Sequence, residues 1–316
     1  MAISEFSLIA ELFVPLATDK AALGLTDDVA LLPPRAGQEL AITTDAILEG
    51  VDFFAEDPPF TIAQKALRVN LSDLAAKGAK PFGYLLTLAL PKRIDMKWLK
   101  AFARGLASDQ KEFGITLLGG DLSATPGPLT ISVTAFGHVP KGKTILRRGA
   151  KLDDRVFVTG TIGDSGAGLA SLKTGRRVPA LVARYRVPQP RVALGQMLRG
   201  IASASLDVSD GLLADLGHIA DVSKVHIVVD AARVPLSPAV RKLWGAGAVL
   251  RAVTAGDDYE IAFTAPLGKR AQVLAAAKAA GTPVTEIGWV MKGRDVALMG
   301  ADGRPIPVGK KGWEHF

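Results

Sequence analysis

Five short acidic segments are the sequence feature that most restricts how this chain can fold. Each ends an apolar, strand-like run in aspartate: Leu25-Thr-Asp27-Asp28, Ile42-Thr-Thr-Asp45, Val69-Asn-Leu-Ser-Asp73, Leu118-Gly-Gly-Asp121 and Leu206-Asp207-Val-Ser-Asp210. A buried carboxylate is costly unless something cationic or a hydrogen-bond donor lies beside it. If the five segments converge, their carboxylates cannot all stay ionised without cations between them. The pattern therefore predicts that the fold gathers these segments around bound cations.

The neighbours of these aspartates indicate which cation is expected. Thr43, Thr44, Ser72 and Ser209 can add neutral oxygen ligands, and Gly119-Gly120 lets the backbone approach a phosphate closely. Hard oxygen ligands without thiol or imidazole suit Mg²⁺, which usually arrives bound to a phosphate. The sequence thus predicts phosphoryl transfer with Mg²⁺.

Composition excludes several other classes of protein. Cysteine is absent, which rules out disulfides, iron–sulfur clusters and thiolate zinc sites, and the four histidines are scattered. No apolar stretch approaches the roughly 20 residues that cross a bilayer. The N-terminus lacks the pattern of a secretory signal, so we expect a cytoplasmic protein.

The net charge of +7 leaves a nucleic-acid-binding module as a non-enzymatic alternative. The basic residues are dispersed, however, and aromatic residues make up only 6%, too few for a stacking platform between these charges. We favour a mixture of two interpretations, in which some of these charges form an ordinary solvated surface and others attract a polyanionic small molecule.

Hydrophobic periodicity predicts a mixed α/β (α+β) chain with two domains. We expect helices over residues 5–14, 61–77, 95–113, 163–171, 191–202, 211–222 and 268–280. We expect strands over residues 40–44, 84–90, 115–118, 129–137, 155–159, 225–229, 284–291 and 296–299. A Gly-rich, basic passage over residues 140–151 separates the halves, giving predicted domains 1–142 and 143–316.

Two glycine-rich segments resemble phosphate-binding loops. Gly137-His-Val-Pro-Lys-Gly-Lys-Thr144 matches the P-loop pattern, but only one helical turn could follow it before Gly149. A P-loop NTPase therefore remains an alternative to the acidic site. The second segment, Thr159 to Gly168, does not match the dinucleotide fingerprint and is interpreted as a tight strand-to-helix turn, with an anion-facing role as the other possibility.

The acidic segments form part of an ordered set of motifs that resembles the thiamine-monophosphate kinases. The set runs nearly the whole chain: Asp27-Asp28-Val-Ala-Leu-Leu, Thr43-Thr-Asp45, Asn70-Leu-Ser-Asp73-Leu-Ala-Ala, Gly119-Gly-Asp121, Asp207-Val-Ser-Asp210-Gly-Leu, Gly256-Asp-Asp-Tyr-Glu260 and Gly312-Trp-Glu-His-Phe316. That family belongs to the superfamily of aminoimidazole ribonucleotide synthetase and selenophosphate synthetase. The resemblance implies a two-domain synthetase-like fold, a homodimer formed by the N-terminal domain, and a nucleotide site between the domains that uses no P-loop.

The resemblance also implies a reaction and the residues that perform it. The γ-phosphoryl group of ATP would pass directly to thiamine monophosphate with several Mg²⁺ ions, without an acid–base or nucleophilic residue. It assigns metal ligation to Asp27, Thr43, Thr44, Asp45, Asp73, Asp121, Asp207 and Asp210. It assigns ATP binding to Gly120, Asp121, Arg147 and Ser209, and stacking on a thiamine ring to Trp313.

Three positions depart from the family pattern. Thr26 replaces a glycine, Asp52 stands where many members carry a substrate-contacting histidine, and Asp257 replaces a substrate-contacting glutamate. We therefore include Asp52 and Asp257 with Trp313 as candidate substrate-binding residues. A different acceptor within the same superfamily remains open, although selenide chemistry is disfavoured because it usually uses an early cysteine.

Overall fold

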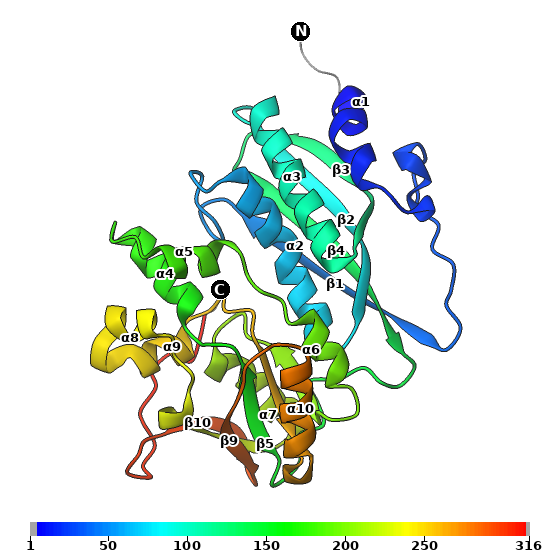
Figure 1. Ribbon diagram of the computed structural model, residues 1–316. Coiled ribbons are helices and arrows are strands. Elements are labelled where there is room, and N and C mark those ends of the chain that lie inside the picture. The colour runs from blue at the N-terminus through cyan, green and yellow to red at the C-terminus, as the bar shows by residue number, and fades with distance from the viewer. Residues whose placement is uncertain (1–4, 314–316) are drawn as a thin grey trace. The chain divides into compact units, whose positions relative to one another are not determined.

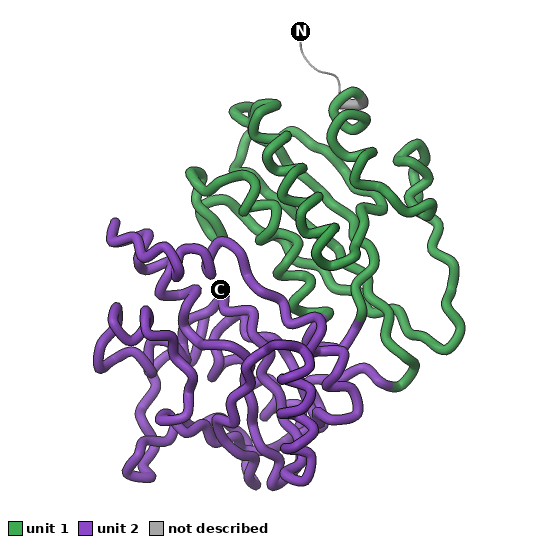
Figure 2. The backbone as a smooth tube through the Cα atoms, viewed as in Figure 1, with its two compact units in different colours: residues 1–74, 80–142 green, residues 75–79, 143–316 purple. Residues whose placement is uncertain are grey.

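The computed structural model describes residues 5–313 (Figure 1). The chain divides into two compact units, coloured separately in Figure 2. Unit 1 runs to Leu74 and continues over Lys80–Gly142, and unit 2 comprises Ala75–Ala79 and the chain from Lys143 onward. In the part of the chain that the structure describes, no helix is long and apolar enough to span a membrane.

Among the described residues, unit 1 contains four strands and two long helices after a series of short helical turns. The turns are α1 (Glu5–Leu8), η1 (Ile9–Phe13), η2 (Val14–Leu16) and η3 (Lys20–Leu25). The longer elements are β1 (Gln38–Leu48), α2 (Pro59–Ala76), β2 (Lys80–Pro91), α3 (Met96–Phe113), β3 (Thr116–Thr125) and β4 (Thr130–Pro140). The strands pair in the order β1-β4-β2-β3, and only β2 and β3 run parallel.

Helices α2 and α3 lie on one face of this sheet (Figure 1). Both long helices were predicted from their apolar periodicity, and α3 ends as expected at Gly114 in the left-handed conformation. A buried ion pair joins the two helices, because Arg68 Nε lies 2.8 Å from Asp109 Oδ2 and both side chains are almost fully buried. Gln64 Nε2 donates to the other oxygen of Asp109 at 2.8 Å.

Unit 2 is built on six strands and seven helices among the described residues. The strands are β5 (Arg155–Thr159), β6 (Ala204–Asp207), β7 (His226–Asp230), β8 (Ile261–Ala265), β9 (Val284–Met291) and β10 (Asp295–Met299). The helices are α4 (Asp164–Lys173), α5 (Pro179–Arg186), α6 (Val192–Met197), α7 (Leu212–Ser223), α8 (Pro238–Trp244), α9 (Ala248–Thr254) and α10 (Arg270–Ala279). Single 3₁₀ turns η4 (Ala231–Arg233), η5 (Gly245–Gly247) and η6 (Leu267–Lys269) join some of them.

The sheet of unit 2 has the order β10-β7-β9-β5-β8-β6 and is covered on both faces. Strand β5 shows the reason, since its apolar side chains alternate between two separate cores. Val156 and Val158 pack with α7 residues in one core, whereas Phe157 packs with α6 and α10 residues in the other. Phe157 stacks on Phe263 of β8 at 5.2 Å between ring centroids, which ties the neighbouring strands together.

The structure corrects the P-loop interpretation. Strand β4 ends at Pro140, and the described stretch 141–154 contains no helix before β5. Strand β4 is also antiparallel to both of its neighbours. The segment Gly137–Thr144 thus lacks the helix N-terminus whose amides would hold a phosphate, and the P-loop NTPase alternative is wrong.

The assumption that each acidic segment ends a strand is also mostly wrong. Only Asp207 ends one, at β6, whereas Asp73 lies in α2 and Asp27 follows η3. Asp45 and Asp121 lie within β1 and β3 rather than at their ends. Asp73 lies where a helix was predicted over residues 61–77, so for that segment the helical prediction is confirmed and the strand-like interpretation of Val69–Asp73 is wrong.

Candidate functional site

In unit 1 an acidic cluster forms where β1 passes α2. The Thr43 hydroxyl donates a 2.5 Å hydrogen bond to Asp73 Oδ2. The Asp45 backbone N–H donates to Oδ1 of the buried Asn70 at 3.1 Å, and the Asn70 amide in turn donates to Ala66 C=O. These bonds fix the orientation of the Asn70 amide. The structure therefore places Thr43, Asp45 and Asp73 together.

The electrostatics of this cluster favour a bound cation. Burial, followed by the negative charges of Asp73 and Asp52, raises the pKa of the Asp45 carboxyl to about 6. Of these causes, the repulsion from the two like charges is the part that a bound cation would offset. Carboxylate and hydroxyl oxygens are donors that fit Mg²⁺.

Thr44 and Asp121 do not join this cluster. Thr44 Oγ1 donates to Val133 C=O at 3.2 Å and lies 3.0 Å from the Thr134 hydroxyl on β4. Asp121 accepts a 2.8 Å bond from the Ser123 hydroxyl on β3. Strands β1 and β3 are the two edges of the sheet, about 14 Å apart at the usual strand spacing.

Gly120 meets a packing requirement that its sequence context did not show. A Cβ at this position would lie 1.8 Å from the Leu86 carbonyl oxygen on the paired strand β2. The glycine is therefore needed for the β2–β3 pairing itself, whether or not a phosphate approaches its backbone.

The remaining predicted residues of unit 1 lie in turns. Asp27 is exposed after η3 and makes no hydrogen bond to the cluster among the described residues. Thr26 has φ −106°, which any residue adopts, so no glycine is needed there. Asp52 Oδ2 accepts the Leu48 N–H at 2.7 Å, and Asp52 C=O accepts from the buried Lys65 Nζ at 2.7 Å, so both groups close the turn after β1.

Unit 2 presents its predicted residues on a loop that follows β6. Asp207 ends this strand, and Ser209, Asp210 and Gly211 come directly after it. The N–H groups of these three residues all donate to one oxygen, Asp215 Oδ2, each at 3.1 Å. Asp215 lies in the first turn of α7 and is 2% exposed.

Asp215 was missed by sequence reasoning. Burial and the charge of Asp210 raise the pKa of its carboxyl to about 7, against the lowering effect of the three backbone donors. Among the described residues, Asp210, Asp215 and His218 form a group whose potential ligand atoms lie within 4.8 Å of one another. The one sequence signal that could have pointed to Asp215 is its position five residues after Asp210.

Asp257 and Trp313, both candidate substrate-binding residues, form backbone hydrogen bonds with the same loop. The Asp257 N–H donates to Ser209 C=O at 2.7 Å, and the Trp313 N–H donates to Asp210 C=O at 2.8 Å. Asp257 has φ +68°, and Trp313 is 58% exposed with Lys310 Nζ 6.0 Å from its ring. The end of the C-terminal motif, residues 314–316, lies outside the described residues.

Asp258 and Glu260 are two further buried acids; both belong to the motif Gly256–Glu260, but sequence reasoning assigned neither of them a role. Asp258 accepts the N–H groups of Gly163 and Ser165 at 2.6 and 3.3 Å, and burial raises its pKa well above the ordinary value. The glycine-rich segment after β5 is thus a tight strand-to-helix turn, as expected. The anion at the start of α4 is the chain's own Asp258.

Glu260 is the centre of a second buried arrangement. It accepts hydrogen bonds from the Thr159 hydroxyl and from the guanidinium groups of Arg184 and Arg191, at 2.5 to 2.9 Å. Glu260 is fully buried and the two arginine side chains are 15% and 17% exposed. Arg147, the predicted ATP-binding arginine, is by contrast exposed in the segment between β4 and β5.

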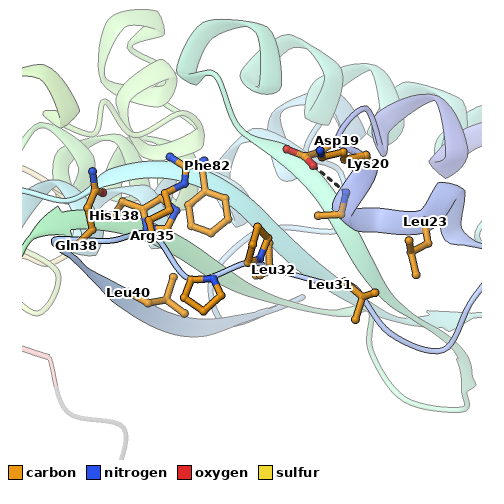
Figure 3. A pocket seen from close by; sticks show the side chains of 13 residues that line it. Asp19, Lys20, Leu23, Leu31, Leu32, Arg35, Gln38, Leu40, Phe82 and His138 are labelled. Atoms are coloured by element: carbon orange, nitrogen blue, oxygen red, sulfur yellow. Dashed lines mark hydrogen bonds between the residues drawn. The ribbon is translucent and has the colours of Figure 1, made fainter.

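Unit 1 also contains a pocket of about 760 Å³ that includes none of the predicted residues (Figure 3). Its walls come from the segment 19–35 and from β1, β2 and β4. Phe82 stacks on His138 at 4.2 Å between ring centroids, and the Arg35 guanidinium lies 5.7 Å from the Phe82 centroid.

Comparison with known proteins defines the class. Residues 26–139 match the N-terminal domain of AIR synthase related proteins, and residues 151–300 match the C-terminal domain. The two domain matches, one in each unit, therefore define an AIR synthase related protein.

Individual relatives narrow this class to one family. The chain is 45% identical to thiamine-monophosphate kinase of Caulobacter vibrioides, covering 99% of this chain and 91% of that protein. It superposes with TM-score 0.87 on the crystal structure of thiamine-monophosphate kinase from Stenotrophomonas maltophilia, at 41% identity over 97% of this chain and 99% of that one. The structure described as AaThiL complexed with AMPPCP and TMP matches with TM-score 0.80 and 32% identity over 99% and 97%.

The chain belongs to the thiamine-monophosphate kinase family. The prediction of a phosphoryl-transfer enzyme, made from the acidic segments, is confirmed at the level of the family.

Proposed function

We propose that this protein transfers the γ-phosphoryl group of ATP to thiamine monophosphate, forming thiamine diphosphate and ADP, with Mg²⁺ as the metal. The observation that carries the proposal is the cluster of Thr43, Asp45 and Asp73, whose like charges favour a bound cation. A related protein at 32% identity is described in complex with AMPPCP, an ATP analogue, and with TMP. TMP is also the abbreviation of thiamine monophosphate, the proposed acceptor.

The proposed roles follow the division into two units. We propose residues 1–142 as the ATP- and metal-binding domain, which is also the dimerisation domain, and residues 143–316 as the C-terminal α/β domain. Metal ligands would be Asp27, Thr43, Thr44, Asp45, Asp73, Asp121, Asp207 and Asp210. ATP would contact Gly120, Asp121, Arg147 and Ser209, and the acceptor would contact Asp52, Asp257 and Trp313.

The proposed phosphoryl transfer does not require a strong general acid or base from the protein. The acceptor is a phosphate that is already anionic at neutral pH, so it needs no strong general base. The obstacle is repulsion between two polyanions, which bound Mg²⁺ would neutralise. The carboxylates hold the metal in place, and the planar guanidinium of Arg147 suits contact with phosphate oxygens.

The structure bears on the two altered acceptor positions. One carboxylate oxygen of Asp52 already accepts the Leu48 N–H in the turn after β1, so this side chain has less hydrogen-bonding capacity for a substrate than a histidine that made no such bond. Asp257 is shorter than the glutamate of the family pattern by one methylene. We therefore expect weaker acceptor contacts, with the metal ligands unaffected.

The direct test is product formation by the purified protein with ATP, MgCl₂ and thiamine monophosphate, followed by chromatography. We expect thiamine diphosphate, its loss in excess EDTA, and a loss of at least 100-fold in kcat for Asp73→Asn. The matched control is Glu56→Gln, which removes an exposed charge in the same unit and should leave turnover unchanged. Full activity in EDTA, or of Asp73→Asn, contradicts the metal assignment.

We also propose a cytoplasmic homodimer formed through the sheet of unit 1. The support is that Leu40 and Ile42 on strand β1 are 48% and 58% exposed and point to the same side of the sheet. Light scattering after gel filtration should give twice the mass of the chain, and Ile42→Glu should shift it toward the monomer. A monomeric wild-type protein at micromolar concentration contradicts this proposal.

A further inference from the structure

The loop of Ser209, Asp210 and Gly211 has an alternating pattern of backbone contacts. Its three N–H groups point to Asp215 Oδ2. Its carbonyl groups point the other way, where Ser209 C=O accepts the Asp257 N–H. Asp210 C=O accepts the Trp313 N–H in the same manner. One side of the loop is thus held by a single carboxylate, and the other side holds two candidate acceptor residues.

The two incoming segments approach this loop in the same way. Gly256 precedes Asp257, and a Cβ on it would lie 2.5 Å from Ser209 C=O. Gly312 precedes Trp313, and a Cβ on it would lie 2.5 Å from Asp210 C=O and 2.5 Å from a methyl of α7. In both segments the residue before the donor must be glycine because the backbone passes so close to the accepting carbonyl.

From these contacts we propose that Asp215 is a positioning residue for both substrates. By holding the loop, it fixes Ser209 and Asp210 in place for the nucleotide and the metal. Through the carbonyl groups of the same loop, it also fixes Asp257 and Trp313 in place for the acceptor. The proposal rests on the proposed function for the identity of the substrates. The positions of the four residues relative to one another depend only on the contacts within unit 2.

The physical basis is the number of bonds that share one buried acceptor. A carboxylate oxygen accepts several N–H groups more strongly than an amide oxygen, because its charge is larger. Asp215 is 2% exposed, so water cannot readily replace it when it is lost. Without it, the buried N–H of Gly211 and the half-buried N–H groups of Ser209 and Asp210 lose their acceptor. The loop is then free to move together with both segments that hydrogen-bond to its carbonyls.

The test uses Asp215→Asn, Asp215→Ala and the control Asp221→Asn, which removes an exposed charge from the same helix α7. KM for ATP, KM for thiamine monophosphate and kcat are measured at several Mg²⁺ concentrations. We expect both KM values to rise at least fivefold in Asp215→Asn and further in Asp215→Ala, and no change in the control. Raising Mg²⁺ should not restore activity, whereas it would partly restore a variant that had lost only a metal ligand.

Hydrogen–deuterium exchange gives a second readout that needs no activity. In ligand-free Asp215→Asn, peptides covering residues 207–213, 256–260 and 311–313 should exchange faster than in the wild type. The sheet of unit 2 should keep its protection, which shows that the variant is folded. A further variant, Gly312→Ala, should raise KM for the acceptor, because its Cβ would displace Trp313 from Asp210 C=O.

Three results would overturn the proposal. They are unchanged exchange in all three segments, a rise in only one of the two KM values, and full recovery of Asp215→Asn at high Mg²⁺. If the wild-type protein makes no thiamine diphosphate, the proposed function fails, and the exchange experiment still decides whether Asp215 positions the loop.

Discussion

Replacing Glu260 by glutamine removes one charge from a buried site that holds two arginines. The carboxylate accepts from Thr159, Arg184 and Arg191, all within 2.9 Å. In Glu260→Gln one oxygen becomes an NH₂ group, which faces donors rather than acceptors, and the two guanidinium groups lose their counter-charge. Breaking a buried ion pair by removing one partner costs about 3–5 kcal/mol.

That free energy converts into a measurable melting shift. For a domain of this size, about 1 kcal/mol lowers Tm by about 2–4 °C, so we expect Glu260→Gln to melt roughly 6–20 °C below the wild type. Circular dichroism on heating and urea titration at constant protein concentration measure this difference. Ligand-free protein is used, so that substrate binding does not add to the apparent stability.

The matched control is Glu286→Gln in the same unit. Glu286 also has three arginine neighbours, Arg155, Arg233 and Arg270, but their side chains are 32–53% exposed. Exposed ion pairs contribute only about 0–1 kcal/mol, so this variant should melt within a few degrees of the wild type. Equal losses in the two variants, or a loss below about 1 kcal/mol for Glu260→Gln, would refute the argument from burial.

Three further predictions concern other contacts. Gly120→Ala should cost about 4 kcal/mol or more by urea titration, since its Cβ would meet Leu86 C=O at 1.8 Å; a loss below about 1 kcal/mol would contradict that contact. Asp109→Ala should cost about 3–5 kcal/mol because it leaves the buried Arg68 without its bidentate partner, and a Tm unchanged from wild type would refute this. Asp258 has a raised pKa, so its own contribution to wild-type stability falls as pH rises above about 4, the unfolded value. Asp258→Asn should therefore gain stability relative to wild type from pH 4 to pH 7, and a constant Tm difference over that range would contradict the buried charge.

Much of the fold was predictable because it depends on local patterns. Helices α2, α3 and α7 and strands β5, β7 and β9 were all predicted within a few residues, since each combines apolar periodicity with a recognisable stop. Helices α5, α8 and α9 were missed, because they are only seven or eight residues long and show little periodicity. Strand β8 was missed because it is buried on both faces and so shows no alternation.

The types of ligand atom in the candidate site could be predicted from the sequence, but the residues that hold its loop in place could not. The residue types around Asp45, Asp73 and Asp210 indicate oxygen ligands whatever the fold. By contrast, sequence reasoning gave no role to Asp215 or Glu260, because each depends on the hydrogen-bond donors that the fold brings to it. A hydrogen bond between residues 101 positions apart, as between Thr159 and Glu260, leaves no mark on local composition.

By itself the sequence determined the alternation of helices and strands, the absence of thiol chemistry, and the oxygen-rich set of candidate ligands, because these follow from side-chain type and spacing. Only the tertiary structure decided that Gly137–Thr144 is a strand end rather than a phosphate loop, and that one buried carboxylate holds the loop of Ser209 and Asp210. The physical reason is that burial and long-range contacts determine how strongly a charged group interacts with its neighbours and in which direction a backbone N–H or C=O group points. Neither quantity is a property of a short stretch of chain.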